Sequence, residues 1–470
     1  MAERMTRREL GKVALAGAAL AGFAGAAGLV GRGSGGSGGK GETRQEVIDR
    51  LPDLGIPRPV DYLRTSWSRD PLALCSYSYL APTRYGSEVR RMLAEPVGRI
   101  VFAGEATANI PATVHGALQA GRDAAKALAR RLDAGARVAV VGAGVAGLAC
   151  AGELLDQGLQ PVLLEASDRV GGRVRSGELD GSRVELGASW IHGIKGNPLT
   201  TLARQAGIGL HHFEYALDFP VPGQQAMGER GEDRIWRSID SFDPHAPGMR
   251  EQTLESLLPR RQGPGLAWAS QTEVQQEYGA DPDQLAALAT WEGGWFGGGD
   301  ALLDGPYVDV VKGLSDQAPV HFGAQVRRII QTSSEVVLSG SGVLDGEGMA
   351  ADAAIVTVPI GVLKAGRIEF EPDLPPRTRT AIRLLGAGLL DKVWLAFEKP
   401  FWDPKWEGFN WIDPRMPGRW GSWANFVPIN GRPFLMTLSG GSDAHRLAGW
   451  SDLEVVGSAM SSLEAMFAQS

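Results

Sequence analysis

Residues 137–173 read RVAVVGAGVAGLACAGELLDQGLQPVLLEASDRVGGR, and this stretch decides the fold that the chain adopts. A short apolar run at Val138–Val141 has the composition of a buried parallel strand. An Ala/Leu-rich helical stretch follows, and a second apolar run lies at Pro161–Leu164. Strand, helix and strand in this order predict an α/β fold built on a parallel sheet.

Three glycines between the first run and the helix have the G-x-G-x-x-G spacing. Gly142 allows the tight turn, Gly144 lets a pyrophosphate approach the backbone, and Gly147 lets the helix pack close to the sheet. The first-turn amides and the helix dipole then hold phosphate charge. Glu165, which ends the second strand, is placed to accept hydrogen bonds from ribose hydroxyls. We therefore expect a dinucleotide site that contains Gly142, Gly144, Val145, Ala146, Gly147, Glu165 and Ala166.

The sequence after this unit indicates which dinucleotide is bound. It continues with a second glycine-rich turn, DRVGGR at 168–173, and then with VELGASWIHGIKGNPL at 184–199. A nicotinamide dehydrogenase has no need of this second turn, whereas a flavoprotein must also hold the far end of an extended FAD. These motifs resemble the FAD-dependent amine oxidase family, which includes monoamine oxidases, polyamine oxidases and lysine-specific histone demethylases.

The resemblance implies an FAD-binding, Rossmann-like domain of the GR2 type and an α+β substrate domain. The cysteine that attaches FAD covalently in some members is not evident, because Cys75 belongs to a tyrosine motif. We therefore expect noncovalent FAD. The resemblance adds Gly172, Arg173, Gly187, Ala188, Ser189 and Trp190 to the expected cofactor site.

The block at 56–130 stands in an unexpected place. It contains WSRDPLALCSYSYLAP, then VFAGEATANIPATVHGALQAGRDAAKAL. In the family, the matching motifs close the chain, but here they precede the glycine turn. The order therefore predicts a circular permutation in which residues 131–136 join the usual last helix to the usual first strand. Such a rearrangement is physically acceptable if the original termini lie close together.

Two elements of this block are expected to reach the cofactor. Ile100–Phe102 has the composition of a short buried strand, and Thr113–Ala127 that of a helix. The N-terminus of this helix should face the flavin, where its dipole stabilises negative charge. By resemblance, Glu105 contacts the ribityl and phosphate region. The expected cofactor residues of this block are Gly104, Glu105, Thr113 and Val114.

Three residues of the motifs are candidates for contact with substrate. Tyr77, in CSYS, matches the aromatic residue that flanks the substrate amine, although a core tyrosine fits the same pattern. Thr113 stands where monoamine oxidases have a second tyrosine, so the two-tyrosine cage should be absent. His192, in GASWIHG, matches a histidine of the substrate channel in polyamine oxidases, although a lone histidine is equally often a packed residue.

Lys392 is the fourth catalytic candidate and interrupts an apolar strand in which Val393 and Leu395 alternate with other residues. A lysine in a buried strand costs several kcal/mol unless it is paired or its pKa falls. In the family, the lysine at this position holds a water against flavin N5. The alternative is an edge-strand lysine whose ammonium group reaches solvent.

Later segments are expected to be core strands that complete the FAD domain. FGGGDALL at 296–303 resembles the family's return strand, and His321–Ile330 suits a strand in which Val326 offers its backbone to the adenine. Ala353–Gly361 is expected to be a buried strand that ends in a proline turn beside the cofactor. The segment at 200–288 is expected to be an irregular helical insertion where substrate choice is set.

Composition excludes some classes of protein. The chain has 470 residues and a net charge of −7, which makes nucleic acid an unsuitable partner and a cationic substrate a suitable one. It has 2 cysteines, which lack metal-ligand spacing, so neither a zinc site nor a disulfide framework is expected.

The N-terminal segment 1–30 contains TRRELGK followed by an apolar run rich in Ala and Gly. This pattern predicts export by the twin-arginine route, to the periplasm or outside the cell, with no stable membrane insertion once the signal is removed. An uncleaved membrane anchor and a cytoplasmic amphipathic segment are the alternatives. We expect a linker at 31–55, an FAD domain at 56–198 and 296–365, and a substrate domain at 199–295 and 366–470.

The activity that the resemblance implies is oxidation of an amine, with a polyamine as the first choice. A neutral amine transfers hydride to flavin N5, the imine is hydrolysed, and O₂ returns the flavin to its oxidised state and forms hydrogen peroxide. No dedicated general base is needed, which agrees with the absence of a His/Asp constellation from the motifs. Two alternatives stay open: another flavoprotein of this fold, such as an L-amino acid oxidase or a carotenoid desaturase, and a flavin-binding protein without catalysis.

Overall fold

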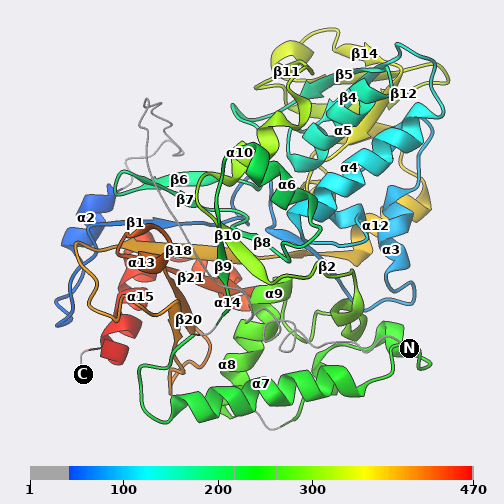
Figure 1. Cartoon of the computed structure of the whole chain (residues 1–470). Coiled ribbons are helices and arrows are strands. Elements are labelled where there is room, and N and C mark those ends of the chain that lie inside the picture. Colours follow the sequence, from blue (N-terminus) through cyan, green and yellow to red (C-terminus); the bar gives the residue numbers. More distant parts are fainter. Residues whose placement is uncertain (1–41, 216, 261–262, 468–470) are drawn as a thin grey trace.

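The computed structural model describes residues 42–215, 217–260 and 263–467, which form two domains that lie side by side (Figure 1). The signal predicted at 1–30 and the glycine-rich stretch at 31–39 lie outside these residues. Within the described part of the chain, no helix is both long and apolar enough to cross a bilayer.

The first domain, at the upper right of Figure 1, is built on a parallel sheet with strand order β11-β5-β4-β15-β3. The strands predicted in 137–173 are β4 and β5, and the strand predicted in the early block is β3. Because β3 and β4 both pair with β15, the early block and the glycine turn belong to one sheet. The bounds are β3 Ile100–Phe102, β4 Arg137–Val141, β5 Gln160–Leu164, β11 Val320–His321 and β15 Ala353–Val356.

Different layers cover the two faces of this sheet. Helices α4 (Val114–Ala129) and α5 (Val145–Asp156), both predicted, pack on one face. A second sheet, ordered β14-β13-β12-β16, packs on the other. Side chains alternate along β4, so that Val140 meets the helices and Ala139 meets the second sheet. The second sheet consists of β12 Val326–Gln331, β13 Val336–Gly340, β14 Met349–Ala351 and β16 Glu369–Glu371.

The second domain is built on an antiparallel sheet with strand order β1-β18-β21-β20-β19. Val393 and Leu395 of β18 face a core shared with α2 and α15, whereas Trp394 faces a core shared with the β6–β7 hairpin. The bounds are β1 Asp61–Arg64, β6 Ser176–Leu179, β7 Ser182–Glu185, β18 Leu390–Ala396, β19 Gly408–Asn410, β20 Ser422–Asn425, β21 Phe434–Gly440, α2 Arg44–Asp49 and α15 Asp452–Phe467.

A helical insertion lies at the bottom of Figure 1 and occupies much of 200–288, as predicted. Its long helix α7 packs on α8, and α8 continues through a π-helical turn into α9. The bounds are α6 Pro198–Gln205, α7 Gln224–Ser241, α8 Pro264–Ser270, the π turn Gln271–Gln275 and α9 Gln276–Tyr278. The remaining elements are β2 Tyr77–Leu80, β17 Leu385–Gly388, α3 Glu88–Ala94, α10 Tyr307–Val311, α11 Ile360–Lys364, α12 Pro376–Leu384, α13 Val427–Asn430 and α14 Gly441–Leu447.

The predicted domain boundaries differ from the structure at three places. The range 31–55 is not all linker, because α2 lies within it and buries Val47 and Ile48 in the core that contains α15. Strand β1, assigned to the FAD domain, pairs with β18 of the other domain. Residues 366–384, assigned to the substrate domain, supply β16 and α12 to the FAD domain.

Three predicted strands also differ from the structure. The stretch His321–Ile330 is not one strand, because β11 ends at His321 and β12 begins at Val326, after a turn in which Gly323 has φ +67°. The return strand is β10 (Asp300–Leu303), but it pairs with β8 (Trp190–Ile191) and β9 (Leu210–Phe213) in a separate three-stranded sheet. Ala353–Gly361 is a strand only as far as Val356.

Helices α4 and α5 approach closely at Gly121. A Cβ built there would lie 2.2 Å from the carbonyl oxygen of Ala146. We predict that Gly121→Ala lowers the free energy of unfolding by about 1–3 kcal/mol, because the overlap outweighs the helix propensity of alanine.

The matched control is Gly457→Ala in α15, where the added Cβ would lie 3.8 Å from Leu51 Cδ2. This variant should be as stable as the parent protein or more stable by up to ~1 kcal/mol. Denaturant midpoints measure both effects, and a Gly121→Ala protein with an unchanged midpoint contradicts the prediction.

Candidate functional site

A cavity of about 480 Å³ brings the two halves of the prediction together. Glu105 of the early block, Gly144 of the glycine turn and Lys392 of β18 all line it, so the expected convergence on one site is confirmed. Gly147 does not line the cavity, because a Cβ there would lie 1.9 Å from the Gly142 carbonyl oxygen, as its packing role requires. The other predicted residues on the wall are Tyr77, Gly104, Thr113, Val114, Gly142, Val145, Ala146, Glu165, Ala166, Gly172, Arg173, Gly187, Ala188, Ser189, Trp190, His192 and Val326.

One end of the cavity has the features of a phosphate site. Gly142 has φ +103°, and Gly144 is the N-cap of α5, so the first-turn amides of α5 open toward the wall that these glycines form. Gly172, in the second glycine-rich turn, has φ +60°, and a Cβ there would lie 3.2 Å from the Cα of Gly144. The two turns therefore meet backbone to backbone.

Glu165 is held at the end of β5 by backbone and side-chain donors. Its Oε2 accepts from the amide of Ala143 at 2.7 Å, and its Oε1 accepts from the amide and hydroxyl of Ser167 at 2.8 and 2.7 Å. A carboxylate offers about four lone-pair positions. The acceptor capacity that remains on Glu165 suits the ribose hydroxyls for which the residue was predicted.

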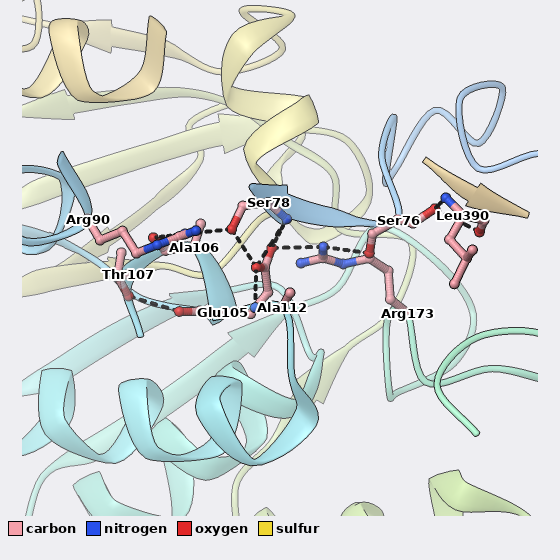
Figure 2. Close-up of polar contacts among 10 residues, drawn as sticks. Ser76, Ser78, Arg90, Glu105, Ala106, Thr107, Ala112, Arg173 and Leu390 are labelled. Atoms are coloured by element: carbon pink, nitrogen blue, oxygen red, sulfur yellow. Dashed lines mark hydrogen bonds and ion pairs between the residues drawn. The ribbon is translucent and has the colours of Figure 1, made fainter. Parts of the chain in front are cut away.

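Glu105 is the centre of a buried polar network (Figure 2). Its carboxylate accepts from Arg173 Nη1 at 3.0 Å, from Ser78 Oγ at 2.7 Å and from the amide of Ala112 at 3.1 Å. Burial acts to raise the pKa of Glu105, but Arg173 and Ser78 outweigh it, and the pKa is lowered. Glu105 is therefore an anion that positions other groups, and its contact with the ribityl and phosphate region of the cofactor stays a prediction.

The network continues to a buried arginine that the sequence did not single out. Arg90 Nη1 donates to Ser78 Oγ at 2.7 Å, and its Nε and Nη2 both donate to the Glu292 carboxylate at 2.9 Å. This bidentate ion pair lies on the wall of a second cavity of about 300 Å³. A network of hydrogen bonds from Glu105 through Ser78 to Arg90 and Glu292 thus connects the two cavities.

Thr113 begins α4 and contributes to the cavity wall. Its Oγ1 donates to the carbonyl of Ile110 at 2.9 Å and accepts from the amide of Gly116 at 3.0 Å, as an N-cap residue does. The helix N-terminus therefore faces the cavity, as predicted. Because the hydroxyl of Thr113 is engaged in the cap, its observed role is structural.

Lys392 is 4% exposed and lies in the centre of the antiparallel sheet. Strand β18 is flanked by β1 and β21, so the alternative of an edge-strand lysine that reaches solvent is wrong. Its Nζ donates to the carbonyls of Glu185 and Gly187, at 3.2 and 2.5 Å, and to Ser189 Oγ. Burial lowers the pKa of Lys392 to about 7, although the nearby Glu185 opposes this shift.

His192 lies where the two cavities meet, and it has a carboxylate partner. Its Nδ1 is 2.7 Å from Asp300 Oδ2 at the start of β10. The amide of Gly193 and the hydroxyl of Tyr215 donate to the same carboxylate, at 2.9 and 3.1 Å. The expectation that the chain lacks a His/Asp constellation is therefore wrong, because the pair forms only when β8 and β10 come together.

The second cavity shares Tyr77, Thr113, Trp190 and His192 with the first. The hydroxyl of Tyr77 donates to the carbonyl of Gln276 at 2.8 Å, and Tyr77 lines both cavities. Its contact with the substrate stays a prediction. Four carboxylates from the helical insertion and the loop after it stand on the wall: Glu232, Glu273, Glu277 and Glu292. Sequence reasoning missed these acids and Asp300, because no motif or spacing connects them with the glycine turn.

The residues of the first cavity fit FAD. Two helix N-termini and the glycine cradle suit phosphate, and Trp190 Nε1 is buried on the wall without a hydrogen-bond partner among the described residues. Cys75 and Cys150 are both buried, and burial raises the pKa of each thiol. Fold and site together define a flavin-dependent oxidoreductase.

The sequence model for flavin containing amine oxidoreductases matches residues 31–129 and 145–470, and the chain belongs to this family. The protein is an FAD-dependent amine oxidase. It is 32% identical over 360 residues to polyamine oxidase 5 of Oryza sativa subsp. japonica, covering 70% of this chain and 72% of that one. It is 30% identical over 339 residues to lysine-specific histone demethylase 1 homolog 1 of Arabidopsis thaliana, covering 66% and 40%.

The solved structures give a similar fold. Wild-type putrescine oxidase bound to putrescine matches with a TM-score of 0.53 and 20% identity over 71% of this chain and 81% of that one. At this identity the match supports the mixed α/β fold alone.

Lys392 provides the prediction for this site. We expect Lys392→Met to keep the yellow cofactor and to slow flavin reduction or reoxidation at least roughly tenfold, which is about 1.4 kcal/mol of barrier. Anaerobic and aerobic stopped-flow absorbance separate the two half-reactions. Lys405→Met, at an exposed position, is the control that should leave both rates unchanged. Parental rates in Lys392→Met would remove this lysine from the mechanism.

Proposed function

We propose that the chain oxidises a linear amine that carries a second cationic nitrogen, such as spermidine or spermine. The observation that carries this proposal is the acidic wall of the second cavity, where Glu232, Glu273 and Glu277 stand beyond the residues shared with the first cavity. A second ammonium group is stabilised by this wall while the reacting amine lies near Tyr77 and Trp190. The names of several relatives, which are polyamine oxidases, agree with this substrate class.

The chain's own residues bind and orient both molecules. The amides at the start of α5, together with Glu165 and Gly172, hold the dinucleotide end of FAD, while Lys392 and Trp190 line the other part of the cavity. FAD, held noncovalently, supplies the acceptor for the hydride and passes the electrons to O₂. Tyr77 and Trp190 exclude water from the reacting amine and leave its lone pair available.

Oxidation of an amino acid is a weaker candidate. It needs an arginine aimed at the substrate carboxylate. Arg90 lies on the wall of the second cavity, but both of its outer nitrogens are engaged by Glu292 and Ser78. Arg173 is likewise paired with Glu105. Both cations are thus neutralised within the protein, which favours a cationic substrate over an anionic one.

A peroxide-coupled assay of the FAD-loaded protein tests the proposal with spermine, spermidine, putrescine, benzylamine and lysine. We expect the highest kcat/KM for one of the polyamines. Peroxide from lysine alone would favour an amino acid oxidase. If none of these amines gives peroxide or bleaches the flavin anaerobically, the chain is better described as a flavin-binding protein without this activity.

Glu277 gives a sharper prediction about the acidic wall. Its charge is felt at Tyr77: burial is the largest cause that raises the pKa of this tyrosine, and the carboxylate of Glu277 is the next. We expect Glu277→Gln to raise the KM for spermidine about tenfold, because one favourable charge interaction of about 1.4 kcal/mol is lost. The KM for benzylamine, which has no second ammonium group, should stay the same, and an equal rise for both amines would contradict the proposal.

We also propose that the order of the chain is a circular permutation of the order in its relatives. Helix α15, the last described helix, packs on α2, the first, so that in the usual order one would lead into the other. The family matches at 31–129 and 145–470 leave a gap that contains the link between α4 and β4, together with β4 itself. A variant that begins at residue 137 and joins residue 470 to 42 should bind FAD and oxidise amines, whereas failure to fold would count against this order.

For localisation, we propose export by the twin-arginine route. The support is the pattern TRRELGK near the N-terminus and its apolar run. Arg7→Lys together with Arg8→Lys should retain the protein in the cytoplasm of a host that has this route. Equal distribution of parent and variant between cell fractions would overturn the proposal.

A further inference from the structure

The carboxylate beside His192 is held more firmly than a surface ion pair would be. Asp300 lies at the first position of β10, and its two oxygens accept from three donors: His192 Nδ1, the amide of Gly193 and the hydroxyl of Tyr215. Burial acts to raise the pKa of Asp300, but its bonds to His192 and Gly193 outweigh this, and the pKa is lowered. Asp300 is therefore an anion at neutral pH.

This contact fixes the tautomer of the neutral imidazole. An ionised carboxylate can only accept hydrogen bonds, so Nδ1 of His192 must carry the proton. Nε2 is then the acceptor nitrogen. The ring of His192 lines both cavities, and its side chain is 38% exposed, so it has access to the substrate and to solvent.

The reaction creates a need for a proton acceptor at this place. An aliphatic amine with a pKa near 10 is an ammonium ion in all but about one molecule in a thousand at pH 7. The ammonium form has no lone pair and cannot be oxidised by loss of hydride from its α-carbon. The acids on the wall of the second cavity favour the protonated substrate, so loss of the proton from the bound amine becomes less favourable.

We propose that His192 is the residue that removes the proton from the bound ammonium group, and that Asp300 is the positioning residue that orients its ring and stabilises the imidazolium. The N–H bond of the substrate breaks, its electron pair stays on nitrogen, and a new N–H bond forms at Nε2. No electron leaves either partner in this step. The imidazolium later returns the proton to solvent. The inference rests on amine oxidation but not on a polyamine as the substrate.

Other titratable groups around His192 are less suited to this task. His115, in the first turn of α4, is buried, which lowers its pKa to about 4, so it accepts a proton poorly at neutral pH. The Nζ of Lys392 is engaged by carbonyl and hydroxyl oxygens. The hydroxyl of Tyr215 donates to Asp300. Further titratable groups on the neighbouring strand and the wall of the second cavity include Tyr77, Tyr79, Arg90, His211, His212, Glu232, Glu273, Glu277, Tyr278 and Glu292. Those on the wall of the first cavity include Asp70, Glu105, Glu165, Arg169, Arg173, Arg175, Tyr307 and Arg367.

The chain offers a matched control pair. His211 Nε2 and Asp304 Oδ2 lie 3.6 Å apart at the other end of the β9–β10 pairing, and neither residue lines the two cavities. Asp304→Asn therefore removes a carboxylate from a similar histidine in the same sheet without touching the site.

The experiment measures the pH profile of kcat/KM for spermidine in three FAD-loaded proteins: the parent, Asp300→Asn and Asp304→Asn. If the parent oxidises benzylamine and not spermidine, benzylamine is the substrate for all three. Loss of the carboxylate lowers the proton affinity of His192, so the acid limb of Asp300→Asn should move to lower pH by about one unit. Its kcat/KM at pH 7 should fall at least about tenfold. Asp304→Asn should match the parent.

A second readout does not depend on turnover. In ¹⁵N-histidine NMR spectra of the FAD-loaded parent, the His192 signals, assigned by their loss in His192→Gln, should show a protonated Nδ1 and an unprotonated Nε2 above the pKa of the ring. Asp300→Asn should change this tautomer balance, and Asp304→Asn should not.

Two outcomes would overturn the proposal. One is an Asp300→Asn profile that is lowered uniformly with its acid limb unmoved, which indicates a structural role alone. The other is a parent protein in which His192 carries its proton on Nε2, a result that needs no variant of Asp300 to fold. If no amine is oxidised at all, the activity itself fails, but the NMR result still decides whether the pair exists as described.

Discussion

The buried carboxylate of Glu105 is the interaction on which the architecture of the site depends. It joins Ser78 of β2, Ala112 before α4 and Arg173 at the end of the second glycine-rich turn, which are remote from one another in sequence. A buried charge is tolerated only when donors surround it, and removal of one partner from such a pair typically costs about 3–5 kcal/mol. These contacts therefore hold the three segments together on this side of the cavity wall.

The same network sets the charge of both cavities. Arg173 is neutralised by Glu105, and Arg90 by Glu292, so the two buried cations contribute little positive potential to the open space. Acids of the helical insertion line the second cavity, while two helix N-termini face the first. In the proposed function, the cofactor phosphates lie at the helix N-termini and the second ammonium group of the substrate lies at the acids of the adjoining cavity.

Sequence was sufficient where the determining signal is local. The glycine spacing, the apolar runs of β3, β4 and β5 and the helix after Thr113 each depend on neighbours along the chain, and all were predicted correctly. The domain boundaries were predicted wrongly at α2 and β16, because these short segments pack against partners that no local pattern reveals. The pair of His192 and Asp300 was not predicted for the same reason. Its members are 108 residues apart, and only the pairing of β8 with β10 brings them together.

The burial of both thiols has a consequence for an enzyme that makes an oxidant. In the proposed reaction, hydrogen peroxide forms next to the protein that releases it. Peroxide attacks thiolates, and Cys75 and Cys150 are both fully buried, with thiol pKa values raised so that the thiolate is scarce. The catalyst is thereby shielded from sulfenic acid formation by its own product, and its lifetime under turnover should be limited by groups other than cysteine.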